Sequence, residues 1–315
     1  MDQMQNLLAT FVTSFQSENT RKAYFADVKE FFLFCEKDLQ LIIERPDQIT
    51  ERLVLVWQKK CTQLPNATVA RKMATLSSFL EFLKNKKHIS KNFMKKMKRR
   101  RVEKDGKTNI LTADELEKIL GTTFQNTLLY KDSHPRLYQL WHLRFAVLHT
   151  LFSVGMRVEE LCSLKIKSLE DLGNDIWRLH MIVKGHETHA PIVHKNTAHI
   201  LREHIELFRY FSQKDDPLFV RAQKRIATNK ETPLHRSSVF HMIRLCAKEA
   251  GIVKKISPHS ARATLATLLH RQGVPIGQIQ SLLNHKQMTT TGIYIKKSDE
   301  IAQAAAMKID FLETL

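Results

Sequence analysis

A dense run of basic residues divides this chain into two segments, each with its own helical pattern of apolar residues. Residues 84–104 include eleven Lys or Arg and a single acid. Such a run belongs on a solvated surface, and its position between two helical segments is typical of an interdomain linker. At 315 residues the chain is long enough for two ordinary domains. We therefore expect a helical domain at residues 1–90, a basic linker at 91–108 and a second domain at 109–315.

The first segment has the apolar spacing of amphipathic helices. One stripe of large apolar side chains, with Ser17 or Asn19 available as N-cap, consists of Tyr24, Val28, Phe31, Phe32 and Cys35. Thr50 is expected to begin a shorter helix, and Asn66 can cap another one directly after Pro65. The spacing predicts a compact bundle of four or so helices.

The second segment also begins with helices. Thr112 and Glu115 have the spacing of a capping box ahead of an apolar run. A long, largely apolar helix is predicted from about residue 136 to 154, with Gly155 as its C-terminal cap. A further helix is predicted from about residue 237 to 250. This segment therefore needs a core built mostly from helices.

A β-hairpin is predicted between these helices. Apolar residues alternate with less apolar ones in residues 175–183, and a returning strand can follow a short turn. Lys184 then lies on the tip side of the hairpin, where a lysine is ordinarily solvated and inert. His186 and His189 are expected to be surface residues or contacts to a ligand. The predicted fold class is thus mainly α with a small β-sheet in the C-terminal domain.

The stretch from residue 257 to 294 holds polar side chains that a core does not require. His259 and Arg262 are three residues apart directly after a proline, so we expect both on one face of a helix. A second helix is predicted to end near His285, and Tyr294 follows nine residues later. A core would use the leucines of this stretch, but not its His, Arg and Tyr. The stretch is therefore a candidate functional site.

Arg157 is a further candidate, because it follows the long apolar helix almost immediately. An arginine in this position would be held rigidly at the interior of the domain. Glu160 lies three residues later, where it can pair with Arg157 or orient it. The alternative is an ordinary Arg-Glu pair at the start of a surface helix.

Charge and cysteine content restrict the partners. The formal net charge of +18 favours a polyanionic partner, with nucleic acid ahead of membrane, although a basic surface that serves only solubility is the alternative. The four cysteines, Cys35, Cys61, Cys162 and Cys246, are scattered without a metal-ligand spacing and are expected to be reduced. The N-terminus does not have the pattern of a signal peptide, and we expect a cytoplasmic protein with no membrane partner.

Six residues together resemble a known catalytic motif. Their identity, order and approximate spacing are similar to the catalytic positions of the tyrosine recombinases, the phage integrase family: Arg157, Lys184, His259, Arg262, His285 and Tyr294. The resemblance implies a helical core-binding domain, which clamps DNA, and a mixed α+β tyrosine-recombinase catalytic domain. Two positions depart from the usual family pattern, which has His at the place of Ala263 and Gly at the place of Asn284. We expect no arm-binding domain ahead of the first helices, and the resemblance is therefore to the simple two-domain Xer and Cre type.

The resemblance also implies a mechanism. Tyr294 would attack a DNA phosphodiester and form a 3′-phosphotyrosyl link, while Arg157 and Arg262 would stabilise the charge on the phosphate oxygens. His259 would act as general base or phosphate donor, and Lys184 as general acid to the leaving 5′ oxygen. Lys195 is the alternative candidate for this lysine. His285 would donate a further hydrogen bond to the phosphate. No metal, nucleotide or other cofactor is expected.

Assembly and DNA contacts follow from the same resemblance. We expect a homo-tetramer on paired sites in double-stranded DNA, with or without a second recombinase, acting in integration, excision or resolution, as on a mobile element. The expected phosphate contacts of the linker are Lys95, Lys96, Lys98, Arg99, Arg100 and Arg101. A C-terminal helix at residues 299–315 would dock on a neighbouring subunit or on its own domain.

Three other functions are compatible with parts of this pattern. A type IB topoisomerase would use the same chemistry as a monomer. A DNA-binding regulator would have lost catalysis, although the intact Tyr294 and both arginines argue against it. A metal nuclease would hydrolyse DNA only with metal and would form no covalent adduct.

Overall fold

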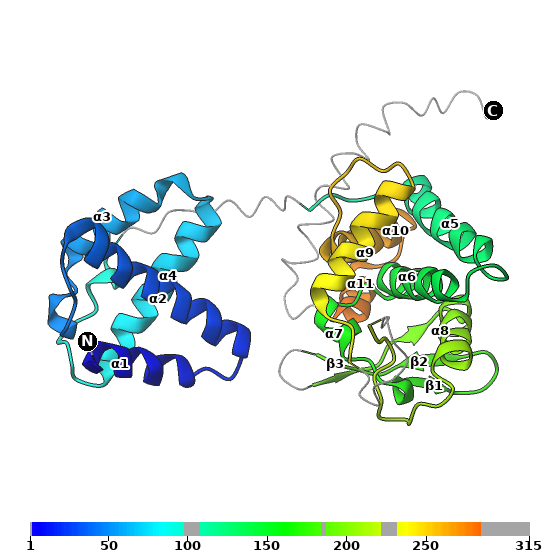
Figure 1. The fold of residues 1–315 in the computed structure, drawn as a ribbon, viewed down its shortest axis with the longest axis horizontal. Coiled ribbons are helices and arrows are strands. Elements are labelled where there is room, and N and C mark those ends of the chain that lie inside the picture. The colour runs from blue at the N-terminus through cyan, green and yellow to red at the C-terminus, as the bar shows by residue number, and fades with distance from the viewer. Residues whose placement is uncertain (1, 98–107, 184–186, 222–231, 285–315) are drawn as a thin grey trace. The chain divides into compact units, whose positions relative to one another are not determined.

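The computed structural model of the chain describes residues 2–97, 108–183, 187–221 and 232–284. It divides into two compact units, Met1–Lys104 and Asp105–Leu315. The first unit contains α1 (Asp2–Thr13), α2 (Glu18–Leu39), α3 (Glu51–Lys60) and α4 (Asn66–Asn85), with short 3-10 helices at Pro46–Gln48, Cys61–Gln63 and Phe93–Lys95. The predicted bundle of four or so helices is confirmed (Figure 1).

Aromatic side chains form the centre of the first unit. The ring centroids of Phe31 and Trp57 lie 5.1 Å apart, and those of Phe11 and Phe79 lie 5.2 Å apart. All four residues are almost completely buried. Aromatic contacts of this kind add to the hydrophobic free energy of burial. The core therefore ties all four helices together.

The helix ends in this unit follow local chemistry with one exception. Ser17 accepts a hydrogen bond from the backbone N–H of Thr20, and Thr50 accepts one from Leu53, as N-caps do. Asn66 was expected to cap the fourth helix, but it is the first helical residue, and Pro65 takes the N-cap position. A proline before the first turn fixes the backbone by itself, because its φ angle is restricted.

The beginning of the basic segment folds onto the first unit. Met94 is buried, and the side-chain amide of Asn92 donates to the carbonyl oxygen of Ser77 at 2.9 Å. Lys95 forms an ion pair with Glu81 at 3.0 Å. Residues 92–97 therefore pack within the first unit, Met1–Lys104, although the sequence predicted a linker from residue 91 onward. Apolar residues among the lysines provide the anchor.

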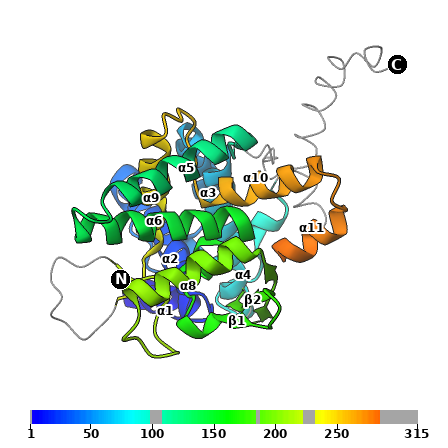
Figure 2. The same cartoon turned by 90° about the vertical axis from the view of Figure 1, so that its right-hand side faces the viewer.

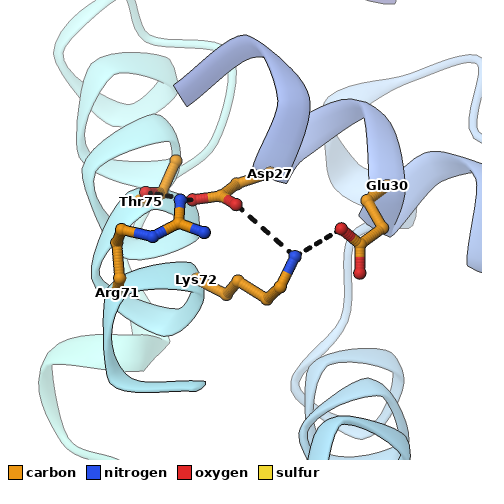
Figure 3. Close-up of polar contacts among 5 residues, drawn as sticks. All are labelled: Asp27, Glu30, Arg71, Lys72 and Thr75. Carbon is orange, nitrogen blue, oxygen red and sulfur yellow. Dashed lines mark hydrogen bonds and ion pairs between the residues drawn. The ribbon is translucent and has the colours of Figure 1, made fainter. Parts of the chain in front are cut away.

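A buried ionic cluster joins α2 to α4. Figure 3 shows Asp27 and Glu30 of α2 facing Arg71, Lys72 and Thr75 of α4. Asp27 pairs with Arg71 and accepts a hydrogen bond from the Thr75 hydroxyl at 3.0 Å. Lys72 pairs with Glu30 and lies 3.5 Å from Asp27, although Lys72 and Asp27 are only 5% and 2% exposed. Charges buried to this degree require their partners.

The second unit is built around α6. Its helices are α5 (Ala113–Leu129), α6 (Pro135–Val154), α7 (Val158–Cys162), α8 (Lys195–Phe208), α9 (Arg236–Glu249), α10 (Pro258–Arg271) and α11 (Ile276–Leu283), with a 3-10 helix at Ile166–Ser168. Helix α6 packs against α5, α8, α9 and α10 (Figures 1 and 2). The expected capping box of Thr112 and Glu115 is present at the start of α5.

The strands are short and form two antiparallel sheets. They are β1 (Leu169–Asp171), β2 (Trp177–Leu179), β3 (Met181–Ile182), β4 (Thr188–His189) and β5 (Ile192–Val193). One sheet has the order β1-β2-β5, and the other pairs β3 with β4. The sequence predicted one continuous hairpin, whereas the outgoing and returning strands each divide between two sheets. The predicted class, mainly α with a small β-sheet in the C-terminal domain, is confirmed.

No helix among residues 2–97, 108–183, 187–221 and 232–284 is long and apolar enough to cross a membrane. The four cysteines are free, and all four lie in the described parts of the chain. Burial raises the pKa of the thiols of Cys35 and Cys162 to about 11, and raises those of Cys61 and Cys246 in the same direction. These thiols are therefore protonated and weakly nucleophilic at neutral pH.

Two histidines face each other inside the second unit. His142 on α6 and His204 on α8 are both 2% exposed, their rings are stacked with centroids 5.5 Å apart, and their Nδ1 atoms are 3.4 Å apart. Burial lowers the pKa of His204 to about 3. Burial also lowers the pKa of His142, against the opposing effect of Glu203, whose carboxylate lies 3.6 Å from Nε2. Both rings are thus neutral in the folded protein at neutral pH.

This pair predicts loss of stability in acid. Below the ordinary pKa of 6.5, an unfolded chain protonates His204, whereas the folded protein does so only near pH 3. The contribution of the neutral ring is complete above about pH 6.5 and declines as the pH falls, by up to about 1.4 kcal/mol per pH unit. We expect His204→Gln to flatten the pH dependence of the free energy of unfolding between pH 6.5 and 4, measured by urea titration. His199→Gln, an exposed histidine on the same helix, is the control. Equal slopes for wild type and His204→Gln would contradict the prediction.

Candidate active site

Arg157 is fixed by the start of α7. It is the N-cap residue of this helix, and its backbone N–H donates to Oε2 of Glu160 at 2.7 Å. Its guanidinium Nη1 donates to Oε1 of the same carboxylate, also at 2.7 Å. Glu160 is 4% exposed, whereas the side chain of Arg157 is 35% exposed. The predicted Arg157–Glu160 contact is therefore present, and one carboxylate positions both the backbone and the side chain of the arginine.

Gly155 brings the end of α6 against α11. It caps α6 with φ of +66°, a conformation that side chains other than glycine adopt only with strain. A Cβ atom at this position would lie 2.5 Å from Cδ2 of Leu283 and 2.9 Å from Cδ2 of Leu265. The glycine is thus required by backbone conformation and by close approach. It places the segment before Arg157 next to the last turn of α11.

Arg262 connects the same elements from α10. It is 4% exposed, and Nη1 donates to the carbonyl oxygen of Gly155 at 2.7 Å. Its Nη2 donates to the carbonyl oxygen of Leu283, the last residue of α11. A buried guanidinium is stable when main-chain carbonyl groups accept its hydrogen bonds. Arg262 therefore links the end of α6 to the end of α11.

His259 lies one turn before Arg262, in the first turn of α10. The helix begins as predicted, with Pro258 as first residue and Ser257 as N-cap, whose hydroxyl accepts from the backbone N–H of Ser260. His259 is exposed whereas Arg262 is buried, so the two differ in environment although they are three residues apart. The exposed imidazole is accessible to a ligand from outside the domain.

Helix α11 is capped at its C-terminus by Asn284, the residue that precedes His285 in the sequence. Asn284 has φ of 48° and ψ of 55°, the left-handed conformation that ends many helices. Glycine adopts this conformation most easily, and asparagine is among the residues that adopt it best after glycine. Asparagine can therefore replace the glycine that the tyrosine recombinases usually have at the position of Asn284.

His189 makes a contact that the sequence did not indicate. It was expected at the surface or on a ligand, but it is half-buried on β4, and its Nε2 lies 2.9 Å from the carbonyl oxygen of Leu282. The two residues are 93 positions apart, and no periodicity or motif connects them. This contact comes only from the tertiary fold.

The structure brings part of the predicted site together. Arg262 donates to the carbonyl of Gly155, two residues before Arg157, which Glu160 holds. His259 precedes Arg262 on the same helix. Other candidates lie outside the described residues: Lys184, His285, Tyr294, Lys98, Arg99, Arg100, Arg101 and the expected helix at 299–315. Lys96 and the alternative Lys195 are exposed, and Lys95 is engaged by Glu81. Within the described ranges, no three His, Cys, Asp or Glu residues are grouped as metal ligands would be.

Comparison with known families supplies the class of protein. Residues 109–300 match the phage integrase family, and residues 11–87 match the N-terminal SAM-like domain of phage integrases. The first match alone covers more than half of the chain. The chain therefore belongs to the phage integrase family and is a tyrosine-type site-specific recombinase.

Individual relatives support this assignment over nearly the whole length. A tyrosine recombinase of Thermosipho africanus is 29% identical over 296 residues, which cover 93% of this chain and 94% of the relative. Tyrosine recombinase XerC of Leptospira interrogans is 28% identical over 284 residues, which cover 90% of this chain and 85% of the relative. Both named relatives are thus tyrosine recombinases, and the second carries the name XerC.

Solved structures share the fold. XerH site-specific recombinase, solved on its difH substrate, has a TM-score of 0.66 and 19% identity over 92% of this chain and 80% of that chain. A lambda integrase dimer of residues 75–356, bound to a COC′ core site, has a TM-score of 0.67 and 17% identity, and the match covers 92% of this chain and 93% of that chain. At this identity the likeness concerns the architecture alone.

Proposed function

We propose that this recombinase cuts and rejoins DNA strands through a covalent 3′-phosphotyrosyl intermediate on Tyr294. The observation that carries the proposal is the buried position of Arg262. This arginine is hydrogen-bonded to the end of α6, two residues before Arg157, and to the end of α11, two residues before His285. One guanidinium therefore links the residues that lie two positions before Arg157 and two positions before His285 in the sequence. Family membership accounts for the identity of the motif.

The chemistry requires positive charge around the phosphate. Arg157 and Arg262 would stabilise the pentacoordinate transition state, and His285 would add a hydrogen bond. Tyr294, with an ordinary pKa of about 10, would transfer its proton to His259 as its oxygen attacks phosphorus. Lys184 would protonate the leaving 5′ oxygen.

The proposed reaction requires no cofactor, because the covalent intermediate conserves the free energy of the broken DNA bond. The phosphotyrosyl bond retains the free energy of the phosphodiester, so a 5′ hydroxyl of another strand can attack it and release Tyr294. Strand exchange then needs no ATP and no metal ion. The rejoining step is the reverse of cleavage with a different strand.

We further propose that the substrate is double-stranded DNA with paired sites, bound by a homo-tetramer. A lambda integrase tetramer has been solved on a Holliday junction, which is the precedent for such an assembly in this fold. The net charge of +18 supports a phosphate-rich partner. Residues 1–90 would act as the DNA clamp, with Lys96 and residues 98–101 contacting phosphates. Lys95 would contribute less, because Glu81 already neutralises it.

Covalent trapping tests the proposal. Wild type and Tyr294→Phe are incubated without metal with fragments from around the protein's own gene, in intact and nicked suicide form, and the reaction is stopped with detergent. We expect wild type to retain DNA covalently and Tyr294→Phe to retain none, because phenylalanine has no nucleophilic oxygen. Tyr210→Phe, which alters an exposed tyrosine on the same unit, is the matched control and should retain DNA as wild type does.

Other outcomes would identify the alternatives. An adduct with Tyr294→Phe would place the nucleophile elsewhere. Binding without an adduct, even on nicked fragments, would indicate a regulator. Metal-dependent hydrolysis without an adduct would indicate a nuclease, and relaxation of supercoiled DNA without paired sites would indicate a topoisomerase.

A further inference from the structure

Helix α11 depends on its surroundings for its position. It has only eight residues, and helices of this length are marginal in water by themselves. No side chain caps its N-terminus at Pro275. Its buried residues Ile279 and Leu283 form a small cluster with Ala266 of α10, separate from the main core. The orientation of its last turn is therefore set by a few contacts.

The last carbonyl groups of α11 are the site of those contacts. A helix leaves its final four carbonyls without partners inside the helix. In α11 the backbone N–H of Asn284 reaches the carbonyls of Gln280 and Ser281. The next two carbonyls, those of Leu282 and Leu283, accept hydrogen bonds from side chains of other elements, His189 and Arg262. Donors at this end are favoured by the negative pole of the helix.

The His189 contact has a defined direction. A carbonyl oxygen can only accept, so the ring donates from Nε2–H across 2.9 Å to Leu282. His189 is paired with Met181 in the sheet formed by β3 and β4, and the backbone N–H of Val183 donates to the carbonyl of Glu187 at 2.8 Å. The two strands flank Lys184 in the sequence. The same ring thus connects the hairpin of Lys184 to the helix that leads into His285.

We infer that His189 is a positioning residue, which clamps the last turn of α11 to β4 and so aligns the strands that flank Lys184 with the helix end that precedes His285. This inference rests on the proposed phosphotyrosyl chemistry for its effect on rate, but the clamp itself is a property of the free protein. His189 is not one of the six motif residues, and in the described part of the chain its ring donates to a main-chain carbonyl. Its loss should therefore slow cleavage without weakening DNA binding.

The test compares two substitutions with a control. His189→Leu removes the donor and retains an apolar side chain of similar bulk, whereas the amide nitrogen of His189→Gln can still donate to the Leu282 carbonyl. His199→Leu replaces an exposed histidine on α8 and serves as the matched control. Each full-length variant is examined free and with DNA. The DNA is a nicked suicide fragment to which wild type becomes covalently attached.

Two measurements separate positioning from general stability. Hydrogen exchange of free protein should be about 5-fold faster in the peptide 277–284 of His189→Leu, the factor expected for one lost hydrogen bond, and unchanged in α6. The single-turnover rate of adduct formation at saturating DNA should fall about 10- to 100-fold, with the dissociation constant within about 2-fold of wild type. His189→Gln should restore both quantities toward wild type.

Several results would overturn the inference. These are exchange in peptide 277–284 equal to that of His199→Leu, faster exchange throughout the second unit, or failure of His189→Gln to restore the rate. If wild type forms no adduct on any fragment, the proposed chemistry fails. In that case the exchange measurement still determines whether His189 holds α11.

Discussion

Replacing Arg262 with lysine is expected to lower the rate of adduct formation by about 10²- to 10³-fold. Nη1 of Arg262 donates to Gly155 at 2.7 Å, and Nη2 donates to Leu283. A lysine retains the charge but has one nitrogen on a flexible stem, so it cannot reproduce the planar fork between the two carbonyls. It would also hold its charge less rigidly beside the pentacoordinate transition state that Arg262 is proposed to stabilise. Single-turnover cleavage of a nicked suicide fragment measures the effect.

The control for this experiment lies on the same helix. Arg271 is the last residue of α10 and is exposed, so Arg271→Lys should leave the rate within about 2-fold of wild type. The free energy of unfolding is measured for both variants, to distinguish slower chemistry from a smaller folded fraction. Cleavage by Arg262→Lys at the rate of wild type would contradict both the link between α6 and α11 and the proposed role of Arg262.

Removing Asp27 is expected to have the largest effect on the stability of the first unit. Asp27→Leu removes the buried carboxylate beside Lys72, which keeps the half-exposed Glu30 as its partner. The substitution also removes the partner of Arg71 and the acceptor of the Thr75 hydroxyl. Breaking a buried ion pair in this way costs about 3–5 kcal/mol of the free energy of unfolding. The loss is measured by hydrogen exchange of α2 and α4 at increasing urea concentration in the full chain.

A second substitution separates charge from packing. Asp27→Leu combined with Lys72→Met replaces both buried charges with apolar groups and should recover most of the lost stability. Glu18→Gln disrupts an exposed pair with Lys22 and should change stability by less than about 1 kcal/mol. If the double variant is as unstable as Asp27→Leu alone, the buried charge of Lys72 is not the cause of the lost stability.

The helix ends were largely predictable because their causes lie within a few residues. Ser17, Thr50 and Thr112 cap helices where expected, since a hydroxyl oxygen next to a first turn accepts from a backbone N–H only three residues away. The long helix ends at Gly155 for a similar reason, because a single residue in the left-handed conformation terminates it. The prediction that Asn66 caps α4 was wrong, because the neighbouring Pro65 occupies the N-cap position.

The arrangement of the strands was less predictable. The alternation in residues 175–183 indicated a strand, but it could not indicate that the segment divides between two sheets at His180. The end of the first unit was equally hard to predict. Residues 92–97 are anchored by apolar residues such as Met94, but the many lysines around it gave this stretch the composition of a linker. In both cases the deciding contacts are made with distant parts of the chain.

The sequence by itself determined the family, the helical character and the identity of the candidate catalytic residues, because these depend on residue types at fixed spacing. Tertiary structure alone decided which residues hold these candidates in place. Gly155, Leu282 and Leu283 contribute mainly backbone carbonyls or close packing, and every residue has a carbonyl. His189 likewise acquires its partner across 93 residues. Such contacts have no sequence pattern, because their specificity comes from position and not from side-chain chemistry.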